Sequence, residues 1–255
     1  MKVESIEPEN GRYAADLVFV HGLFTTKEIW RPAALGFAHR GWRCDLLDLR
    51  YESAAQSLED WCGTVAAHLE SLAAPAILIG HDAGALVALA LGVRGLPHAV
   101  VASAPLLSGI RGVHPRLPVW IAKLRGVDLP PPLPGHEMLA VASAKGRARL
   151  AHALVPDPAR LVTSVQGPAI RPGRAQVPTL LVGYTGDPVA KRHLVEITAQ
   201  GIGADFIARN AGHYAMLEEP WDGWMSEIQR WIIRRGSDAL LNLEGDEDLD
   251  PDALI

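Results

Sequence analysis

The sequence has few cysteines and no long apolar run. No stretch approaches the ~18 uncharged apolar residues of a membrane-spanning helix, which argues against a membrane protein. The first residues, MKVESIEPENGRY, are polar and acidic, unlike a signal peptide. The two cysteines, Cys44 and Cys62, are 18 positions apart and belong to no C-x-x-C or histidine pattern, so we expect reduced thiols rather than a disulfide or a metal site. From these three features together we expect a cytoplasmic location.

Signals for cofactors and nucleic acid are also missing. No phosphate-binding loop accompanies the glycines, and the histidines do not have the spacing of metal ligands. We therefore expect no cofactor, no metal and no nucleic-acid binding. What the chain does have is 49% hydrophobic and 21% charged residues, as in soluble globular proteins. Its 255 residues allow one large domain, or one domain with an inserted lid.

One pentapeptide carries the strongest signal, Gly80-His81-Asp82-Ala83-Gly84. The apolar run 76–79 before it has the length of a buried strand, and 85–91 after it is rich in helix formers. Strand, sharp turn and helix form the context in which G-x-S-x-G is a nucleophile elbow, with glycines where side chains would clash. Here Asp82 stands in the serine position.

Strand-like and helix-like segments alternate along most of the chain. Apolar runs typical of buried strands lie at 17–20, 44–49, 76–79, 98–103, 177–183 and 204–208. Helical segments are expected at 30–40, 58–72, 85–91, 188–200 and 221–234. This alternation predicts an α/β fold, a mostly parallel sheet with helices on both faces and a site at the carboxyl ends of the strands.

The middle and the end of the chain differ from this core. Residues 107–174 hold ten of the 19 prolines and ten basic against three acidic side chains. Residues 236–255 hold seven acidic and no basic side chains. We therefore expect a core of 1–106 and 175–235, a basic lid at 107–174 with one or two helices within 137–154, and a mobile acidic tail at 236–255.

Two more chemically useful residues follow predicted strands. Asp187 comes after the strand at 177–183, and His213 comes after the strand at 204–208. With Asp82 they stand in the order nucleophile, acid, histidine, as in α/β-hydrolase triads. A carboxylate is a competent nucleophile at sp³ carbon and leaves a covalent alkyl ester. His213 would activate water to hydrolyse that ester, and Asp187 would orient the imidazole.

The same layout predicts an oxyanion hole and a pocket. The backbone N–H of Ala83, with that of Leu23 or Phe24, would form the oxyanion hole. Side chains close to the predicted site are candidates for the substrate pocket: His21, His81, Trp120 and Tyr214.

These motifs resemble the α/β-hydrolase family across roughly residues 13–106 and 175–235. The turn at His21-Gly22, the GHDAG elbow, the acid loop before Asp187 and the Gly-His loop at His213 match its layout. An elbow with aspartate is similar to the branch of haloalkane dehalogenases and epoxide hydrolases, in which aspartate is the nucleophile. The resemblance implies a small-molecule hydrolase with a lid before the acid loop, which agrees with 107–174.

The chain departs from both named activities of that branch. Ala83 follows the nucleophile, where the dehalogenases usually carry an aromatic or charged residue. No tyrosine lies in 107–174, where the epoxide hydrolases have theirs. Three lid histidines are alternative proton donors, although each is more simply a surface residue: His114, His136 and His152. The type of catalysis is therefore better supported than either activity.

Two other functions stay open at this point. The first is a lyase, a cyclase or a ring-opening enzyme in which Asp82 and His213 transfer protons. The second is a non-catalytic ligand receptor, against which stands the cost of burying an unused Asp–His–Asp set. The basic lid is either a solvated face or a surface that steers an anionic or phosphate-linked, carrier-bound substrate. The oligomeric state cannot be read from the sequence.

Overall fold

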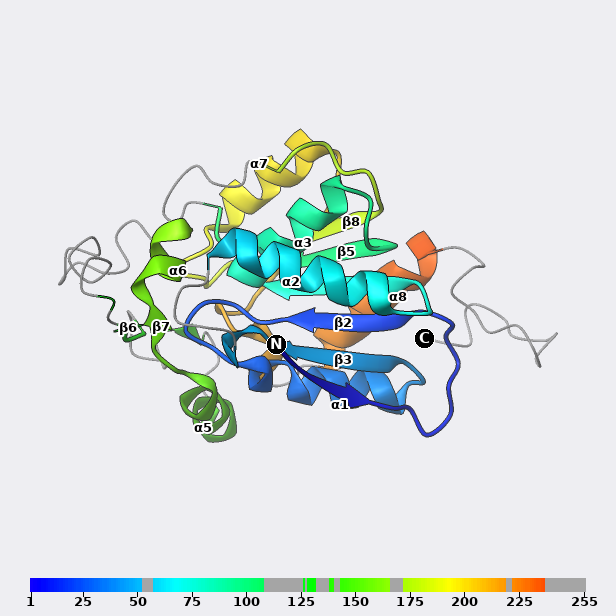
Figure 1. The fold of residues 1–255 in the computed structure, drawn as a ribbon, viewed down its shortest axis with the longest axis horizontal. Helices are drawn as coiled ribbons and strands as arrows, with labels where there is room; N and C mark the ends of the chain where they lie inside the picture. The colour runs from blue at the N-terminus through cyan, green and yellow to red at the C-terminus, as the bar shows by residue number, and fades with distance from the viewer. Residues whose placement is uncertain are drawn as a thin grey trace.

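A seven-stranded sheet organises the computed structural model, which describes residues 1–51, 57–107, 126, 128–131, 138–139, 143–165, 172–218 and 222–236 (Figure 1). The strand order is β1-β3-β2-β4-β5-β8-β9. The bounds are β1 Lys2–Ile6, β2 Asp16–Val20, β3 Arg43–Asp48, β4 Ala76–His81, β5 Ala99–Ser103, β8 Thr179–Tyr184 and β9 Asp205–Arg209. β1 is antiparallel to β3, and the other neighbouring pairs are parallel. The predicted fold class is confirmed.

The strands are buried on both faces, which explains their continuous apolar runs. All five residues of β2 are buried. Because side chains alternate along a strand, Leu17 and Phe19 enter one hydrophobic cluster while Val18 and Val20 enter the other. The expected strands agree with the observed ones to within about two residues at each end.

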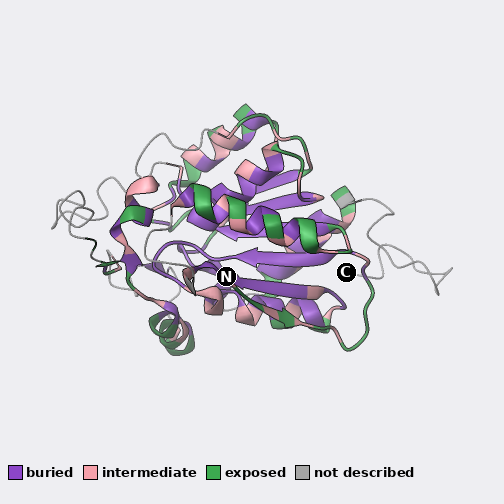
Figure 2. Ribbon diagram, in the orientation of Figure 1, coloured by how far each residue is buried: buried purple, intermediate pink, exposed green. Residues whose placement is uncertain are grey.

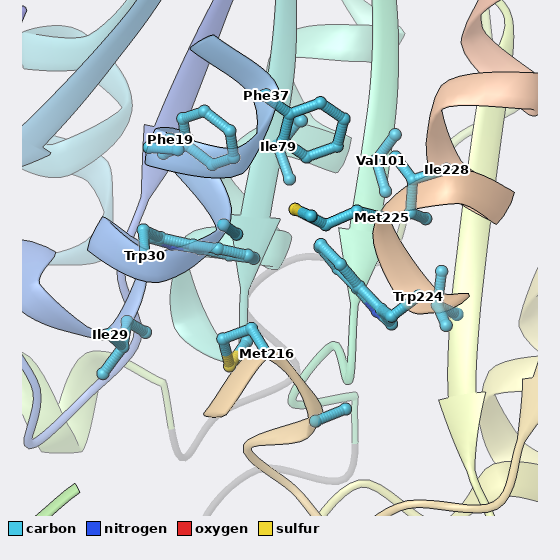
Figure 3. Packing of buried hydrophobic residues seen from close by; sticks show 14 of the residues in the cluster. Phe19, Ile29, Trp30, Phe37, Ile79, Val101, Met216, Trp224, Met225 and Ile228 are labelled. Atoms are coloured by element: carbon cyan, nitrogen blue, oxygen red, sulfur yellow. The ribbon is translucent and has the colours of Figure 1, made fainter. Parts of the chain in front are cut away.

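Helices cover both faces of the sheet, and most of them have a buried inner side and an exposed outer side (Figure 2). α1 and α8 supply one hydrophobic cluster, and α2, α3 and α7 supply the other. Figure 3 shows Phe37 of α1 and Met225 of α8 beside Ile79 of β4, and Ile228 of α8 beside Val101 of β5. The bounds are α1 Arg31–His39, α2 Leu58–Ser71, α3 Ala83–Val93, α7 Arg192–Ile202 and α8 Asp222–Gly236, with short 3₁₀ helices η1 Lys27–Ile29, η2 Leu49–Tyr51 and η4 Ala215–Leu217.

Local signals explain where two of these helices begin. α2 starts with a capping box in which the side chains of Ser57 and Asp60 each accept a hydrogen bond from the other's backbone N–H. α7 begins at Arg192, four residues later than the expected Pro188. The carboxylate of Asp187 accepts hydrogen bonds from the N–H groups of Val189 and Ala190, and this turn delays the helix.

The chain between β5 and β8 forms small elements, which lie at the end of the sheet toward which β2 points (Figure 1). β6 Asp128–Leu129 pairs antiparallel with β7 Asp157–Pro158. α5 Ala144–Ala153, within the expected helical region, precedes β7, and α6 Ala159–Ser164 follows it. Apart from Gly236, the acidic tail lies outside the described residues. Within the part of the chain that the structure describes, no helix is long and apolar enough to cross a membrane.

Candidate active site

Asp82 sits on a sharp turn between β4 and α3. Its backbone angles, φ 54° and ψ −116°, are in a region that residues with a side chain rarely adopt. Glycines make the turn possible by close approach. A Cβ on Gly80 would lie 2.2 Å from the carbonyl oxygen of Gly84, and one on Gly84 would lie 2.4 Å from that of His21. Gly22 is equally constrained, since a Cβ there would lie 2.5 Å from the Cβ of Asp82.

The two oxygens of the Asp82 carboxylate have different surroundings. Oδ2 accepts a hydrogen bond of 3.0 Å from the backbone N–H of Leu23. Oδ1 is buried and has no hydrogen-bond partner among the described residues. Burial raises the pKa of Asp82 to about 6, while the charge of His213 and the N–H groups of Leu23 and Ala83 oppose that rise. The carboxylate is therefore mostly ionised at neutral pH, and only Oδ2 has a hydrogen-bond partner among the described residues.

His213 is held by Asp187. Its Nδ1 lies 2.8 Å from Oδ2 of Asp187, and both side chains are buried. Because an ionised carboxylate only accepts hydrogen bonds, Nδ1 carries the proton and Nε2 is left as the base. Burial alone lowers the pKa of His213, but the charge and hydrogen bond of Asp187 and the charge of Asp82 outweigh it, so the net pKa is raised. The structure thus brings together Asp82, His213 and Asp187.

The loops that carry Asp187 and His213 are bonded to each other. The N–H of Gly186 donates to the carbonyl of Ala211 at 3.0 Å, and the Thr185 hydroxyl donates to Oδ1 of Asn210 at 2.9 Å. The buried carboxylate of Glu218 accepts from the N–H of Gly212 at 2.7 Å, next to His213. Sequence reasoning missed Glu218, because nothing in its spacing marks an acid that holds a loop.

Three of the four pocket candidates are described. The ring of His81 lies 4.5 Å from that of His213 and 5.2 Å from that of Tyr214, centroid to centroid. Burial and the neighbouring charge of His213 hold the pKa of His81 well below its usual value, so it is neutral. Burial, with the charges of Asp82 and Asp187, raises the pKa of Tyr214 well above its usual value. Both rings thus border the reacting groups.

His21 has a different place from the other two. Its Nδ1 bonds to the carbonyl of Gly22 at 2.9 Å, and its Nε2 accepts from the N–H of Leu49 at 3.2 Å. Both ring nitrogens are therefore used within the protein, and neither is free for a substrate. Trp120, His114 and His136 lie outside the described residues, and His152 is exposed on α5.

A second buried carboxylate, Asp157 of β7, also lies near Asp82, and sequence reasoning gave it no role. Its Oδ2 accepts from the backbone N–H of Phe24, one residue after the Leu23 N–H that bonds Asp82. Leu23 and Phe24 are the two alternatives expected beside Ala83 for the oxyanion hole, and the N–H of Leu23 is the one that bonds to Asp82. No group of three or more His, Cys, Asp or Glu side chains in the described ranges could hold a metal ion.

Comparison with known proteins agrees with this architecture. The chain matches the model of the Alpha/beta hydrolase family over residues 17–226. No curated protein matches its sequence. Similar solved structures include a monoacylglycerol lipase of Paleococcus ferrophilus, with 18% identity, coverage of 92% of this chain and 100% of that one, and a TM-score of 0.77.

Two further solved structures have a similar fold at comparably low sequence identity. The enol-lactonase of Burkholderia xenovorans LB400 has 18% identity, coverage of 91% of this chain and 95% of that one, and a TM-score of 0.71. MenH from S. aureus has 14% identity, coverage of 90% and 97%, and a TM-score of 0.67. At such identities the structures share a fold. Together with the family match over most of its length, this establishes that the chain belongs to the α/β-hydrolase family.

Proposed function

We propose that this protein is a small-molecule hydrolase that works through a covalent alkyl ester on Asp82. The observation that carries the proposal is that the two oxygens of the Asp82 carboxylate differ in their hydrogen bonding. Oδ2 is held by a backbone N–H, and Oδ1 is buried without a hydrogen-bond partner in the described part of the chain. An oxygen of this kind is poorly solvated and is available to attack carbon.

The reaction has two steps. Oδ1 of Asp82 attacks an sp³ carbon of the substrate, and the bond from that carbon to the leaving group breaks. Nε2 of His213 then takes a proton from water, and the resulting hydroxide attacks the ester carbonyl of Asp82. Negative charge develops on Oδ2, where the Leu23 N–H already lies at 3.0 Å and the Ala83 N–H also contributes. When this intermediate collapses, the ester bond to the alkoxide breaks and the proton held by His213 passes to the alkoxide, which leaves as an alcohol. The carboxyl group of Asp82 then loses its proton to solvent and is a carboxylate again.

The charges of the site favour this order of events. The negative charge of Asp82 is one of the causes that raise the pKa of His213. Alkylation removes that charge, so the pKa of His213 falls when the ester has formed. The lower pKa favours the unprotonated, basic form of His213 that the second step requires. Asp187 keeps the ring in the tautomer that leaves Nε2 unprotonated.

The substrate of this proposal is an epoxide, a haloalkane or a compound with a comparable leaving group, as in the aspartate branch of the family. The similar structures named lipase and enol-lactonase suggest esters or lactones instead. Attack of Asp82 on an acyl group would give a reactive anhydride rather than a stable ester, so we rank acyl substrates lower. The proposal includes a lid at 107–174, a cytoplasmic setting and no cofactor.

A second candidate is proton transfer in a lyase or cyclase reaction. The observation that favours it is the near-neutral pKa of Asp82, about 6, because an acid or base works best when its pKa lies close to the ambient pH. In that case the free Oδ1 would exchange a proton with the substrate, and no covalent intermediate would form.

The deciding experiment is intact-protein mass spectrometry of a His213→Gln variant exposed to epoxides, haloalkanes, lactones and esters. Without its base the second step stalls, so the adduct of the first step accumulates. The matched control is the Asp82→Asn/His213→Gln double variant, which keeps the shape of the site but has no nucleophile. We expect a stable mass increase in the single variant alone, mapped by peptide sequencing to Asp82.

The mass of the adduct would identify the substrate class. If no compound forms an adduct while the wild-type enzyme still consumes one of them, Asp82 is not a nucleophile and the proton-transfer reaction takes its place. If nothing is consumed but a compound binds, the protein is a receptor.

A further inference from the structure

Asp157 lies in a segment far from Asp82 in sequence, and the proposed reaction does not use it. It is 1% exposed, and its Oδ2 accepts the backbone N–H of Phe24. We propose that Asp157 is a positioning residue that holds residues 22–26, here called the donor loop, so that the Leu23 N–H stays directed at Oδ2 of Asp82. The kinetic part of this inference rests on the proposed function.

The donor loop and the chain leading into β7 are joined by several backbone bonds. The N–H of Thr26 donates to the carbonyl of Ala153 at 3.2 Å, and the N–H of Val155 donates to the carbonyl of Phe24 at 2.9 Å. The carboxylate of Asp157 completes this pairing at the one remaining backbone group of Phe24, its N–H. Both backbone hydrogen-bonding groups of Phe24 therefore bond to the 107–174 segment.

The conformation of Phe24 explains why it needs this support. Its φ is +57°, a left-handed value that is unfavourable for a bulky residue and persists only where surrounding contacts impose it. Without the Asp157 carboxylate, one of the two backbone bonds that impose this φ is lost. Leu23 is the preceding residue, so a change in the backbone of Phe24 reaches the N–H that Asp82 uses.

Arg50 helps to hold Asp157 in position. Oδ1 of Asp157 lies 3.4 Å from Nε of Arg50, and Nη2 of Arg50 donates to the carbonyl of Pro156 at 2.6 Å. Burial raises the pKa of Asp157 to about 7; the Phe24 N–H and Arg50 oppose the rise, and Asp82 and Asp128 add to it. The charge of Asp157 in turn contributes, after burial and the charges of Asp82 and Asp187, to the raised pKa of Tyr214. Protonation of Asp157 near neutral pH would weaken its bond to Phe24, because a neutral carboxyl is a weaker acceptor.

The test compares three variants of the full chain. Asp157→Ala removes the acceptor, and Asp157→Asn keeps an acceptor oxygen but no charge. The matched control is Asp128→Asn, which removes an exposed carboxylate from the partner strand β6 without touching the donor loop. Amide hydrogen exchange of Leu23 and Phe24, followed by NMR in the substrate-free protein, measures how firmly the donor loop is held. The values of kcat and KM on a compound that the wild type consumes measure how the loss of Asp157 affects the reaction.

For Asp157→Ala we expect exchange of both amides to be at least about tenfold faster, while Val18 in β2 keeps its protection. We expect kcat to fall by about 10²-fold with KM within about threefold, since loss of an oxyanion donor costs ~10²–10³. Asp157→Asn should restore kcat to within about tenfold of wild type. It should also abolish the pH titration near 7 that we expect for the Phe24 amide proton.

Unchanged exchange at Leu23 and Phe24, or an unchanged kcat in Asp157→Ala, would overturn the inference. Equal acceleration at Val18 would also overturn it, because Asp157 would then only stabilise the fold. Failure of the proposed chemistry is distinguishable: His213→Gln would trap no adduct, while Asp157→Ala would still loosen the two amides and so support the positioning role.

Discussion

Asp82 combines two unfavourable features that a purely structural residue would avoid. Its backbone is left-handed, and its carboxylate is buried with one oxygen lacking a described partner. Both features raise the free energy of the folded state, and both suit a nucleophile that must project from a turn and be poorly solvated. The burial of the Asp82 carboxylate should therefore affect both the stability of the protein and the pH dependence of its reaction.

Replacing Asp82 by Asn should stabilise the protein at pH 8. The pKa of Asp82 is about 6 against an ordinary 3.8, so ionising it costs the folded state on the order of 3 kcal/mol above pH 6. Asn pays no such penalty. The gain in the free energy of unfolding should shrink as the pH falls through 6 and vanish near 4, as measured by urea denaturation. A gain that is independent of pH would contradict this origin.

The rate should show the same ionisation. In the proposed reaction only the carboxylate form of Asp82 attacks carbon, so log kcat/KM should rise with pH up to about 6 and then level off. Because Asp82, His213 and Asp157 interact, the measured value belongs to the group of residues rather than to one of them. A pH–rate profile from 4.5 to 8.5 on the substrate found by mass spectrometry is the measurement. A profile without an acidic limb would argue against a carboxylate nucleophile.

At the scale of elements, the strand–elbow–helix unit depends on close backbone contact. Gly84, the first-turn glycine of α3, lies so close to the carbonyls of Val20 and His21 that no side chain fits. α3 can therefore approach the carboxyl end of β2 closely, which places Asp82 beside the Leu23 N–H. The glycine spacing that marks the elbow in the sequence has this steric reason.

Two glycine-to-alanine changes should have opposite effects. Gly84→Ala should destabilise the fold by about 3 kcal/mol or more, because its Cβ would meet rigid backbone at 2.4 Å. Gly63 lies exposed within α2 with nothing within 4 Å of a Cβ, so Gly63→Ala should stabilise by roughly 0.5–1 kcal/mol. Thermal unfolding of the two variants and the wild type makes the comparison. Similar losses in both would mean that the elbow is not the constrained element.

Most elements could be predicted because their signals are local. β2 and β4 are short apolar runs in the sequence, and α2 has a periodic apolar face. The start of α7 was predicted too early, because the turn at Asp187 depends on side-chain-to-backbone hydrogen bonds that periodicity does not report. β6 and β7 were not predicted, since two-residue strands carry no pattern.

At the scale of the whole molecule, the parallel sheet brings distant residues to one edge. β2, β4, β8 and β9 lie in one sheet with a common direction, so the loops carrying Leu23, Asp82, Asp187 and His213 meet at their carboxyl ends. The 107–174 segment contacts the same end through Asp157. The contacts at this edge of the sheet therefore position both the four loops of the candidate site and the 107–174 segment.

The separation of charge along the chain allows a test at this scale. Residues 107–174 carry a net charge of +7 and residues 236–255 a net charge of −7. If the basic segment attracts an anionic substrate, KM should rise with salt, and deleting 237–255 should change KM while kcat stays the same. Steady-state kinetics at two ionic strengths, with the full chain as control, makes the measurement. Constant KM under both changes would leave the basic segment as a solvated surface.

The sequence alone determined the fold class, the position of the elbow and the order of Asp82, Asp187 and His213, because these are expressed in spacing and periodicity over a few neighbouring residues. Tertiary structure decided which amide faces Asp82 and what Asp157 bonds. The Leu23–Asp82 bond spans 59 residues and the Phe24–Asp157 bond spans 133. Such partners are chosen by how the sheet and the segment above it pack, and no local pattern records that choice.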